Sequence, residues 1–222
     1  NANIEEVLRA LASLPIRERK SDAKPIFIVA RSFDINKPGT KPKELHGAVL
    51  GGMLKQGILK IGEEIEIKPG RVIKENNQQN YQPVKTKIIS LFKGSKKVDA
   101  LTPGGSASIE TELDMALGKS DSLAGNLASH PNNLPQATAK IKINYELFSS
   151  KSAPSINSKL LQKETIMLSI NAAITGGTIQ KITDKEIEVQ LKIPAIFFKG
   201  DNVGIAKNVQ NHWRLVGYGE VI

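Results

Sequence analysis

The sequence contains no cysteine, and this absence excludes several classes of protein. Without thiols the chain can form neither a disulfide framework nor a thiolate metal site. Its three histidines, His46, His130 and His212, are far apart in the sequence and offer little to a metal ion. We therefore expect no metal site in this chain. An intracellular, reducing compartment suits such a composition.

Long apolar runs are also missing. No segment approaches the about 18 apolar residues that a membrane-spanning helix needs, and the N-terminus lacks a basic stretch followed by an apolar one. We therefore predict a cytoplasmic protein that does not contact a membrane. With 222 residues, of which 40% are hydrophobic, the chain can still bury two cores of ordinary size.

Acidic residues are outnumbered by basic ones. The chain has 31 Lys and Arg against 22 Asp and Glu, a net charge of +9 that is spread along the sequence. This excess favours a polyanionic partner such as a nucleic acid. A solvated, lysine-rich surface explains the same surplus equally well.

Nucleotide-binding and catalytic motifs are missing as well. The segment "LGKSDS" resembles part of a phosphate loop, but Leu113 stands where that loop requires a glycine. In "INKPG", Gly39 stands where a guanine-reading motif requires an aspartate. No Ser-His-Asp arrangement or pair of catalytic carboxylates emerges. We therefore expect that this chain is not an enzyme and has no cofactor of its own.

One helix is predicted, at the N-terminus. Apolar residues recur at the spacing of one helical face, namely at Ile4, Val7, Leu8 and Leu11. Asn3 can cap this helix together with Glu6, and Pro15 ends the pattern. Residues 1–23 therefore form a helix and a linker. The helix either ends a preceding domain or packs on the barrel that follows it.

From residue 24 the pattern becomes strand-like. Short β-rich runs such as "IFIVARSF", "TKIISLF" and "GSASIET" alternate with Gly, Pro, Asn and Asp, as in a barrel or sandwich. In "EIEIK", Ile65 and Ile67 alternate with charged residues, which predicts that Glu66 and Lys68 face water. The polar segment 74–82 is predicted to be an exposed hairpin loop.

A second boundary is predicted at "SHPNNLPQ", residues 129–136, where prolines and asparagines interrupt the pattern. Strand-like runs then resume, "TDKE" is typical of a hairpin turn, and residues 149–159 form a polar loop. The sequence thus predicts an all-β fold of two β-barrels in series, at residues 24–130 and 131–222, after one helix.

The order of these segments resembles a known family. "VARSFDINKPGT", "HGAVLGGMLKQGILKIGEEIEIKPG", "TELDMALGKSDSLAGNL" and "HWRLVGYGEVI" resemble the second and third domains of the gamma subunit of translation initiation factor two, in its archaeal and eukaryotic form. The resemblance runs from Pro25 to Ile222. The first helix looks like the last helix of that subunit's GTP-binding domain, whose own motifs are absent here.

The resemblance implies a role in translation initiation. With GTP bound, the family's gamma subunit carries methionylated initiator tRNA to the small ribosomal subunit. Its second domain docks the alpha subunit through exposed loops, and its GTP-binding domain docks the beta subunit. GTP and magnesium would therefore belong to the domain that is missing from this chain.

The resemblance also implies a site for the aminoacylated end of the tRNA on the first barrel. The candidate residues lie at strand ends or in glycine-rich corners, and they are Arg31, Phe33, Asp34, Gly47, Ser90, Phe92 and Lys93. Arginine and lysine can meet phosphate, and phenylalanine can offer an apolar face to a base. Asp34 can accept hydrogen bonds from sugar hydroxyls.

Structural explanations compete with several of these assignments. Arg31 and Asp34 can instead form an internal ion pair beside a core Phe33, and Gly47 can simply form a tight barrel corner. Trp213, the single tryptophan, is predicted to be buried in the closing strand. The alternatives for the whole chain are a free-standing β-barrel module that binds RNA or protein and the barrels of a related translation elongation factor.

Overall fold

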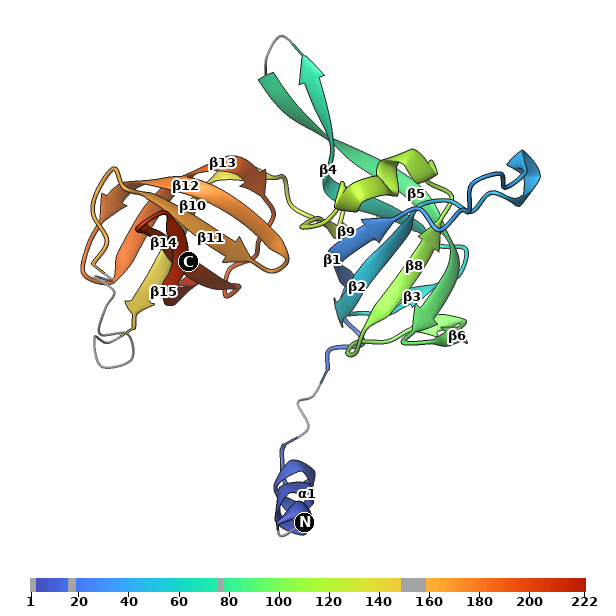
Figure 1. Ribbon diagram of the computed structural model, residues 1–222, viewed down its shortest axis with the longest axis horizontal. Coiled ribbons are helices and arrows are strands. Elements are labelled where there is room, and N and C mark those ends of the chain that lie inside the picture. Colours follow the sequence, from blue (N-terminus) through green and yellow to red (C-terminus); the bar gives the residue numbers. More distant parts are fainter. Residues whose placement is uncertain (1–2, 16–18, 76–77, 149–158) are drawn as a thin grey trace.

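The computed structural model describes residues 3–15, 19–75, 78–148 and 159–222. Within them the chain forms an N-terminal helix, α1 (Ile4–Ala12), and two closed six-stranded barrels in series (Figure 1). All the strand pairs of both barrels are antiparallel. The predicted all-β fold of two barrels after one helix is confirmed.

The first barrel closes in the strand order β4-β9-β1-β2-β8-β5, with β5 pairing back onto β4. Its strands are β1 (Ile26–Phe33), β2 (Val49–Gln56), β4 (Glu64–Glu75), β5 (Gln78–Lys93), β8 (Ala107–Thr111) and β9 (Leu127–Ser129). Smaller elements are β3 (Leu59–Lys60), β6 (Lys96–Val98), β7 (Ala100–Leu101) and the 3-10 helices η1 (Pro42–Glu44) and η2 (Met115–Asp121). Alternate strand residues point inward and form one core, which includes Phe27, Leu50, Ile67 and Ile109.

The charged residues of β4 correct one expectation. Ile65 and Ile67 are fully buried as predicted, but Glu66 and Lys68 are only 5% and 6% exposed. Their side chains form an ion pair of 3.1 Å, and Lys68 Nζ donates to the carbonyl oxygen of Leu134 at 3.2 Å. The prediction of a solvated face was wrong because the linker between the barrels covers it.

The described residues of segment 74–82 form strands and not a loop. Strand β4 continues to Glu75 and β5 starts at Gln78, so that most of this segment belongs to a long hairpin arm that projects beyond the barrel (Figure 1). Cross-strand polar contacts support the arm, because Arg71 Nη2 donates to Gln82 Oε1 at 2.6 Å. Polarity alone does not exclude a strand whose both faces meet water.

The second barrel closes in the order β10-β13-β12-β11-β14-β15. The strands are β10 (Thr138–Leu147), β11 (Thr165–Ile170), β12 (Ala173–Ile182), β13 (Glu186–Ala195), β14 (Asn202–Val209) and β15 (His212–Val221). Its separate core includes Ile143, Leu168, Ile187 and Ile205. The "TDKE" segment forms the expected turn between β12 and β13, whereas most of the predicted loop 149–159 lies outside the described residues.

The two barrels contact each other directly. Ile26 and Leu127 of the first barrel pack with Leu134 of the linker and Ile196 of the second barrel, and all four are buried. An ion pair of 2.5 Å joins Lys55 Nζ of β2 to Asp201 Oδ1, just before β14. A buried apolar cluster and an ion pair therefore join the two barrels.

Helix α1 buries none of its residues against the described part of the chain. Its apolar residues Ile4, Val7, Leu8 and Leu11 are all more than half exposed. The predicted cap was wrong, because Asn3 has φ 82° and its side chain makes no capping hydrogen bond. In the described segments no helix is both long enough and apolar enough to cross a membrane.

Candidate nucleic-acid interface

Four strands of the first barrel carry the candidate residues or their cross-strand neighbours on the outside of the barrel. Directly opposite residues of antiparallel strands point to the same side of a sheet. Two such cross-strand rows run over β1, β2, β8 and β5. They are Arg31, Gly51, Ser108 and Phe92, and next to them Phe33, Val49, Glu110 and Ser90. Strands β1 and β5 lie on opposite sides of the closed barrel, so the two ends of each row face different directions.

A hollow of about 800 Å³ lies over the β1–β2–β8 part of these rows, where it is lined by Arg31, Phe33, Gly51 and Ser108, and it continues to the second barrel. Gly51 leaves room for the ring of Phe33, since a Cβ there would lie 3.3 Å from Cε1 of Phe33. Gly52 serves the backbone instead, because a side chain there would collide with the carbonyl oxygen of Ile28. One wall comes from Arg31 and Phe33, and the opposite wall includes Asn171.

Arg31 makes a different ion pair from the one considered from the sequence. Its Nε lies 3.3 Å from Asp121 Oδ1, not beside Asp34, and its side chain remains 71% exposed. Asp121 is already fixed, because its Oδ1 accepts a hydrogen bond from the Ser32 backbone at 3.0 Å. The guanidinium is therefore anchored at one nitrogen while the rest of it faces solvent beside the hollow.

Asp34 is occupied by protein groups. Its Oδ1 accepts hydrogen bonds from the backbone N–H and the side-chain amide of Asn36 at 2.9 and 2.7 Å, and its Oδ2 lies 3.5 Å from Lys119 Nζ. The Asn36 backbone hydrogen bond is the main reason that the pKa of Asp34 is lowered. The alternative of an Arg31–Asp34 pair is wrong, and Asp34 instead holds the turn that follows β1.

Ser90 binds a glutamate that sequence reasoning missed. Its hydroxyl donates to Glu110 Oε2 at 2.5 Å, and Nδ1 of His46 lies 2.6 Å from Glu110 Oε1. Burial raises the pKa of Glu110, but the hydrogen bonds from Ser90 and His46 outweigh it, so this pKa lies below its ordinary value. The outward position of Glu110 in "SASIET" was the available signal, yet only the pairing of β8 with β5 reveals its partners.

The remaining candidates separate into two groups. Phe92 belongs to the Arg31 row, whereas Lys93 Nζ turns to the hydroxyl of Thr102 at 2.9 Å. Gly47 is a tight corner, because a Cβ there would overlap the carbonyl oxygen of Thr111. The structure therefore places Arg31 and Phe33 together at the hollow, whereas Ser90 and Phe92 lie on β5, across the barrel from β1, and do not line it.

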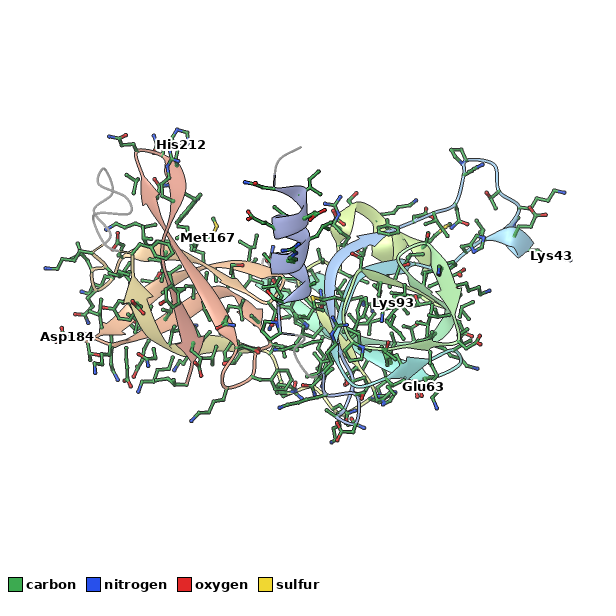
Figure 2. The ribbon with its side chains drawn as sticks, turned by 90° about the horizontal axis from the view of Figure 1, so that it is seen from below. Lys43, Glu63, Lys93, Met167, Asp184 and His212 are labelled. Atoms are coloured by element: carbon green, nitrogen blue, oxygen red, sulfur yellow. The ribbon has the colours of Figure 1, made fainter. Side chains whose placement is uncertain are left out.

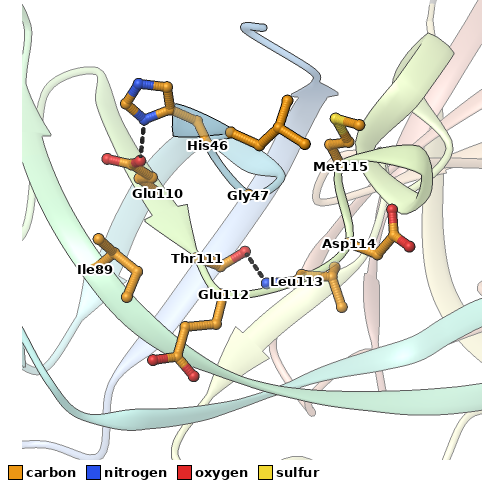
Figure 3. A pocket seen from close by; sticks show the side chains of 10 residues that line it. His46, Gly47, Ile89, Glu110, Thr111, Glu112, Leu113, Asp114 and Met115 are labelled. Carbon is orange, nitrogen blue, oxygen red and sulfur yellow. Dashed lines mark hydrogen bonds and ion pairs between the residues drawn. The ribbon is translucent and has the colours of Figure 1, made fainter. Parts of the chain in front are cut away.

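A second hollow of about 590 Å³ has Glu110 in its lining (Figure 3). Leu45, Ile89 and Met115 supply apolar surface, and the carboxylates of Glu110 and Glu112 lie among them. None of its lining residues is Lys or Arg. Within the described segments, no group of His, Asp and Glu side chains could hold a metal ion. This acidic hollow suits a basic group of a partner better than a phosphate.

Trp213 of the second barrel is not buried, contrary to the prediction from the sequence. This side chain is 42% exposed and Leu215 is 56% exposed, although both lie on the closing strand β15. Figure 2 shows His212 at the end of the β14–β15 hairpin, which projects from the barrel. Trp213 was expected to be buried in the core, but it lies on the part of the strand that extends past it.

The sequence of this chain is similar to those of known proteins. A family model described as "Initiation factor eIF2 gamma, C terminal" matches residues 139–221. Translation initiation factor 2 subunit gamma of Methanococcus vannielii is 40% identical over 226 residues, which cover 100% of this chain and 55% of that protein. The chain belongs to the gamma subunit family of translation initiation factor 2.

Further relatives agree with this assignment. The gamma subunits of Methanocaldococcus jannaschii and Pyrococcus abyssi are 41% and 38% identical, over 99% and 98% of this chain and 54% of each relative. The chain thus spans about half the length of the curated relatives it matches. It corresponds to the barrel domains of the initiation factor gamma subunit, and the GTP-binding portion is not part of it.

Proposed function

We propose that this chain binds the aminoacylated 3′ end of methionylated initiator tRNA on the outer face of its first barrel. It would do so as part of a cytoplasmic gamma subunit that delivers this tRNA to the small ribosomal subunit. One observation carries the proposal: the exposed guanidinium of Arg31 and the half-exposed ring of Phe33 line one hollow together with Gly51 and Gly52.

The chemistry of these residues suits the end of an RNA strand. The exposed guanidinium of Arg31 can meet a phosphate, and the half-exposed ring of Phe33 offers an apolar face to a base. Ser90 is only 4% exposed and its hydroxyl donates to Glu110, so it is not assigned a direct contact with the RNA. Part of the family's pocket belongs to the GTP-binding portion, so binding by this chain alone should be weak and salt-sensitive and should hardly depend on the amino acid.

The test compares Arg31→Ala with Arg71→Ala in binding to methionylated initiator tRNA at two salt concentrations. Loss of one charged contact should weaken binding roughly fivefold and reduce the salt dependence. Arg71 is a matched control, because it is an exposed arginine on the hairpin arm that bonds to Gln82. A stably folded Arg31→Ala protein with wild-type affinity would remove Arg31 from the site. Tight, salt-independent, methionine-dependent binding by the wild type would refute a divided pocket.

A protein partner is proposed for the acidic hollow beside Glu110. The alpha subunit of the factor would dock there through the loops of the first barrel, whereas the beta subunit would bind the GTP-binding portion. Support comes from the carboxylates of Glu110 and Glu112 among apolar residues in a chain of net charge +9. In size-exclusion chromatography Glu112→Lys should abolish co-elution with the alpha subunit, and Asp184→Lys on the second barrel should not.

Helix α1 is proposed to pack against the GTP-binding portion of the subunit, which would cover its exposed apolar face. GTP and magnesium would bind to that portion and not to the barrels. Calorimetry of this chain with GTP should therefore give no heat of binding. Saturable binding in the micromolar range would contradict this division of roles.

A further inference from the structure

The hollow over the first barrel has a second wall that belongs to the other barrel. Asn171 and Ala172, at the turn between β11 and β12, line it opposite Arg31, Phe33 and Met53. Neither residue belongs to the strands that carry the proposed RNA site. The width of the hollow therefore depends on how the second barrel is held against the first.

Polar contacts link this turn to the first barrel. Lys55 Nζ, on the same strand as Gly51 and Met53, lies 2.5 Å from Asp201 Oδ1. The other oxygen of Asp201 accepts a hydrogen bond from Asn171 Nδ2 at 2.9 Å. Asp201 thus connects strand β2, which lines the hollow from the first barrel, to the β11–β12 turn, which lines it from the second barrel.

Asp201 is positioned to act as a rigid connector. It is only 4% exposed, and its Oδ2 also accepts a hydrogen bond from the Phe198 backbone at 3.0 Å. Burial raises its pKa, but the bonds from Lys55, Phe198 and Asn171 outweigh burial, and the pKa of Asp201 is lowered. A buried carboxylate with three donors has little freedom to move.

The backbone on both sides of the contact fits closely. Gly125, with φ 83°, approaches the second barrel so nearly that a Cβ there would lie 3.1 Å from the Cα of Ala173. Asn171 adopts φ 53°, which turns the chain between β11 and β12 at this point. The turn is therefore held by a close backbone approach as well as by Asp201.

We infer that Lys55, Asp201 and Asn171 form a latch that fixes the Asn171–Ala172 turn as the second wall of the RNA-end groove. Asp201 and Lys55 are positioning residues in this role, and Ala172 faces the bound RNA. The inference rests on the proposed function for its ligand. The geometry of the latch can be measured without RNA.

The first experiment measures the distance between the barrels. Because the chain has no cysteine, Lys87→Cys on β5 and Lys185→Cys beyond β12 can each carry a spin label without competing thiols. Pulsed electron resonance should give one narrow distance in the wild-type background and a broad distribution in Lys55→Met. Lys142→Met is the control, since it removes an ion pair of 2.7 Å with Glu186 whose two residues both belong to the second barrel. An equally narrow distribution in Lys55→Met overturns the latch.

The second experiment fills the groove. Ala172→Trp should weaken binding of methionylated initiator tRNA by roughly fivefold or more, because the indole would occupy space between the two walls. Asp184→Trp is the matched control, since it places the same side chain in a turn at the far end of the second barrel (Figure 2). If a folded Ala172→Trp protein binds the tRNA with wild-type affinity, the inference that Ala172 faces the bound RNA is wrong.

The two experiments separate the inference from the proposed function. Broadened distances together with weaker RNA binding in Lys55→Met support the latch as a positioning device. Broadened distances with unchanged RNA affinity overturn its role in positioning. If the wild type fails to bind the tRNA at any salt concentration, the proposed function is wrong, and so is the claim that Ala172 faces RNA. The distance distributions of the first experiment still test whether Lys55, Asp201 and Asn171 hold the barrels together.

Discussion

The two barrels have the same inner pattern and different outer faces. In both, alternate strand residues such as Leu50 and Leu168 are fully buried in a core of Ile, Leu and Val. On the first barrel the outward residues include charges that are paired with one another. On β15 of the second barrel they include the exposed apolar side chains of Trp213 and Leu215.

This difference shows which part of the sequence carries which information. Inward positions must be apolar in any closed barrel, so they specify the fold and little else. Outward positions are free of that requirement, and they differ according to what each barrel contacts. Both outer surfaces carry ion pairs, such as Arg31–Asp121 and Lys142–Glu186, and exposed apolar side chains, such as Met53 and Leu215, so the outer faces differ in how these groups are arranged and not in their kind.

The largest effect is expected for the buried ion pair of the first barrel. Lys68→Met should lower the free energy of unfolding by about 3–5 kcal/mol, because the carboxylate of Glu66 would remain buried without its counter-charge. Denaturant unfolding measures this change. The double variant Glu66→Gln, Lys68→Met should recover most of the loss, and a failure to recover would mean that packing of Lys68, not charge, is what matters.

Equal core substitutions should affect the two barrels separately. Leu50→Ala and Leu168→Ala each remove a fully buried side chain and should each cost about 2–5 kcal/mol. Hydrogen exchange should show lost protection mainly in the barrel that carries the substitution, because the cores are distinct clusters. Equal loss of protection in both barrels would contradict two independent cores.

The sequence could predict the barrels because their periodicity is a local property. The alternation around Ile65 and Ile67 was sufficient to place both in the core. The burial of Glu66 and Lys68 could not be predicted in this way, since it depends on a linker more than 60 residues further along the chain. Segment 74–82 was misinterpreted for a related reason: a strand with two solvated faces lacks an apolar alternation.

The candidate site was predictable in part. Arg31, Phe33, Ser90 and Phe92 were proposed through family resemblance; Arg31 and Phe33 line one hollow, whereas Ser90 is buried beside Glu110 on the other side of the barrel. Glu110 was missed, because its partners Ser90 and His46 lie 20 and 64 residues away. No local pattern contains such a long-range contact. The same limit applies to Asp121, the actual partner of Arg31.

A smaller effect is expected at the contact between the barrels. Asp201→Asn should destabilise the protein by on the order of 1 kcal/mol at pH 7, because Lys55 loses a charged acceptor. The pKa of Asp201 is lowered in the folded state, so its charge stabilises the fold above the ordinary value of 3.8. That stabilisation is lost as the pH falls through the depressed pKa.

Thermal unfolding of wild type and Asp201→Asn between pH 7 and pH 3 checks this expectation. The gap in melting temperature should shrink as the pH approaches the low end of the range. A gap that stays constant would show that the carboxylate contributes through shape and not through charge.

The smallest effect is expected on the apolar outer face of the second barrel. Leu215 lies on β15 and is 56% exposed, whereas Ile205, on the neighbouring strand β14, is fully buried. Leu215→Ser should therefore change the free energy of unfolding by no more than about 0.5 kcal/mol, because a surface substitution creates no cavity. Ile205→Ser, the matched control, should destabilise the barrel severely, since it places a hydroxyl in the core. Calorimetry of both variants measures the contrast. If Leu215→Ser proved as damaging as the control, Leu215 would belong to the core and not to the outer face of the barrel.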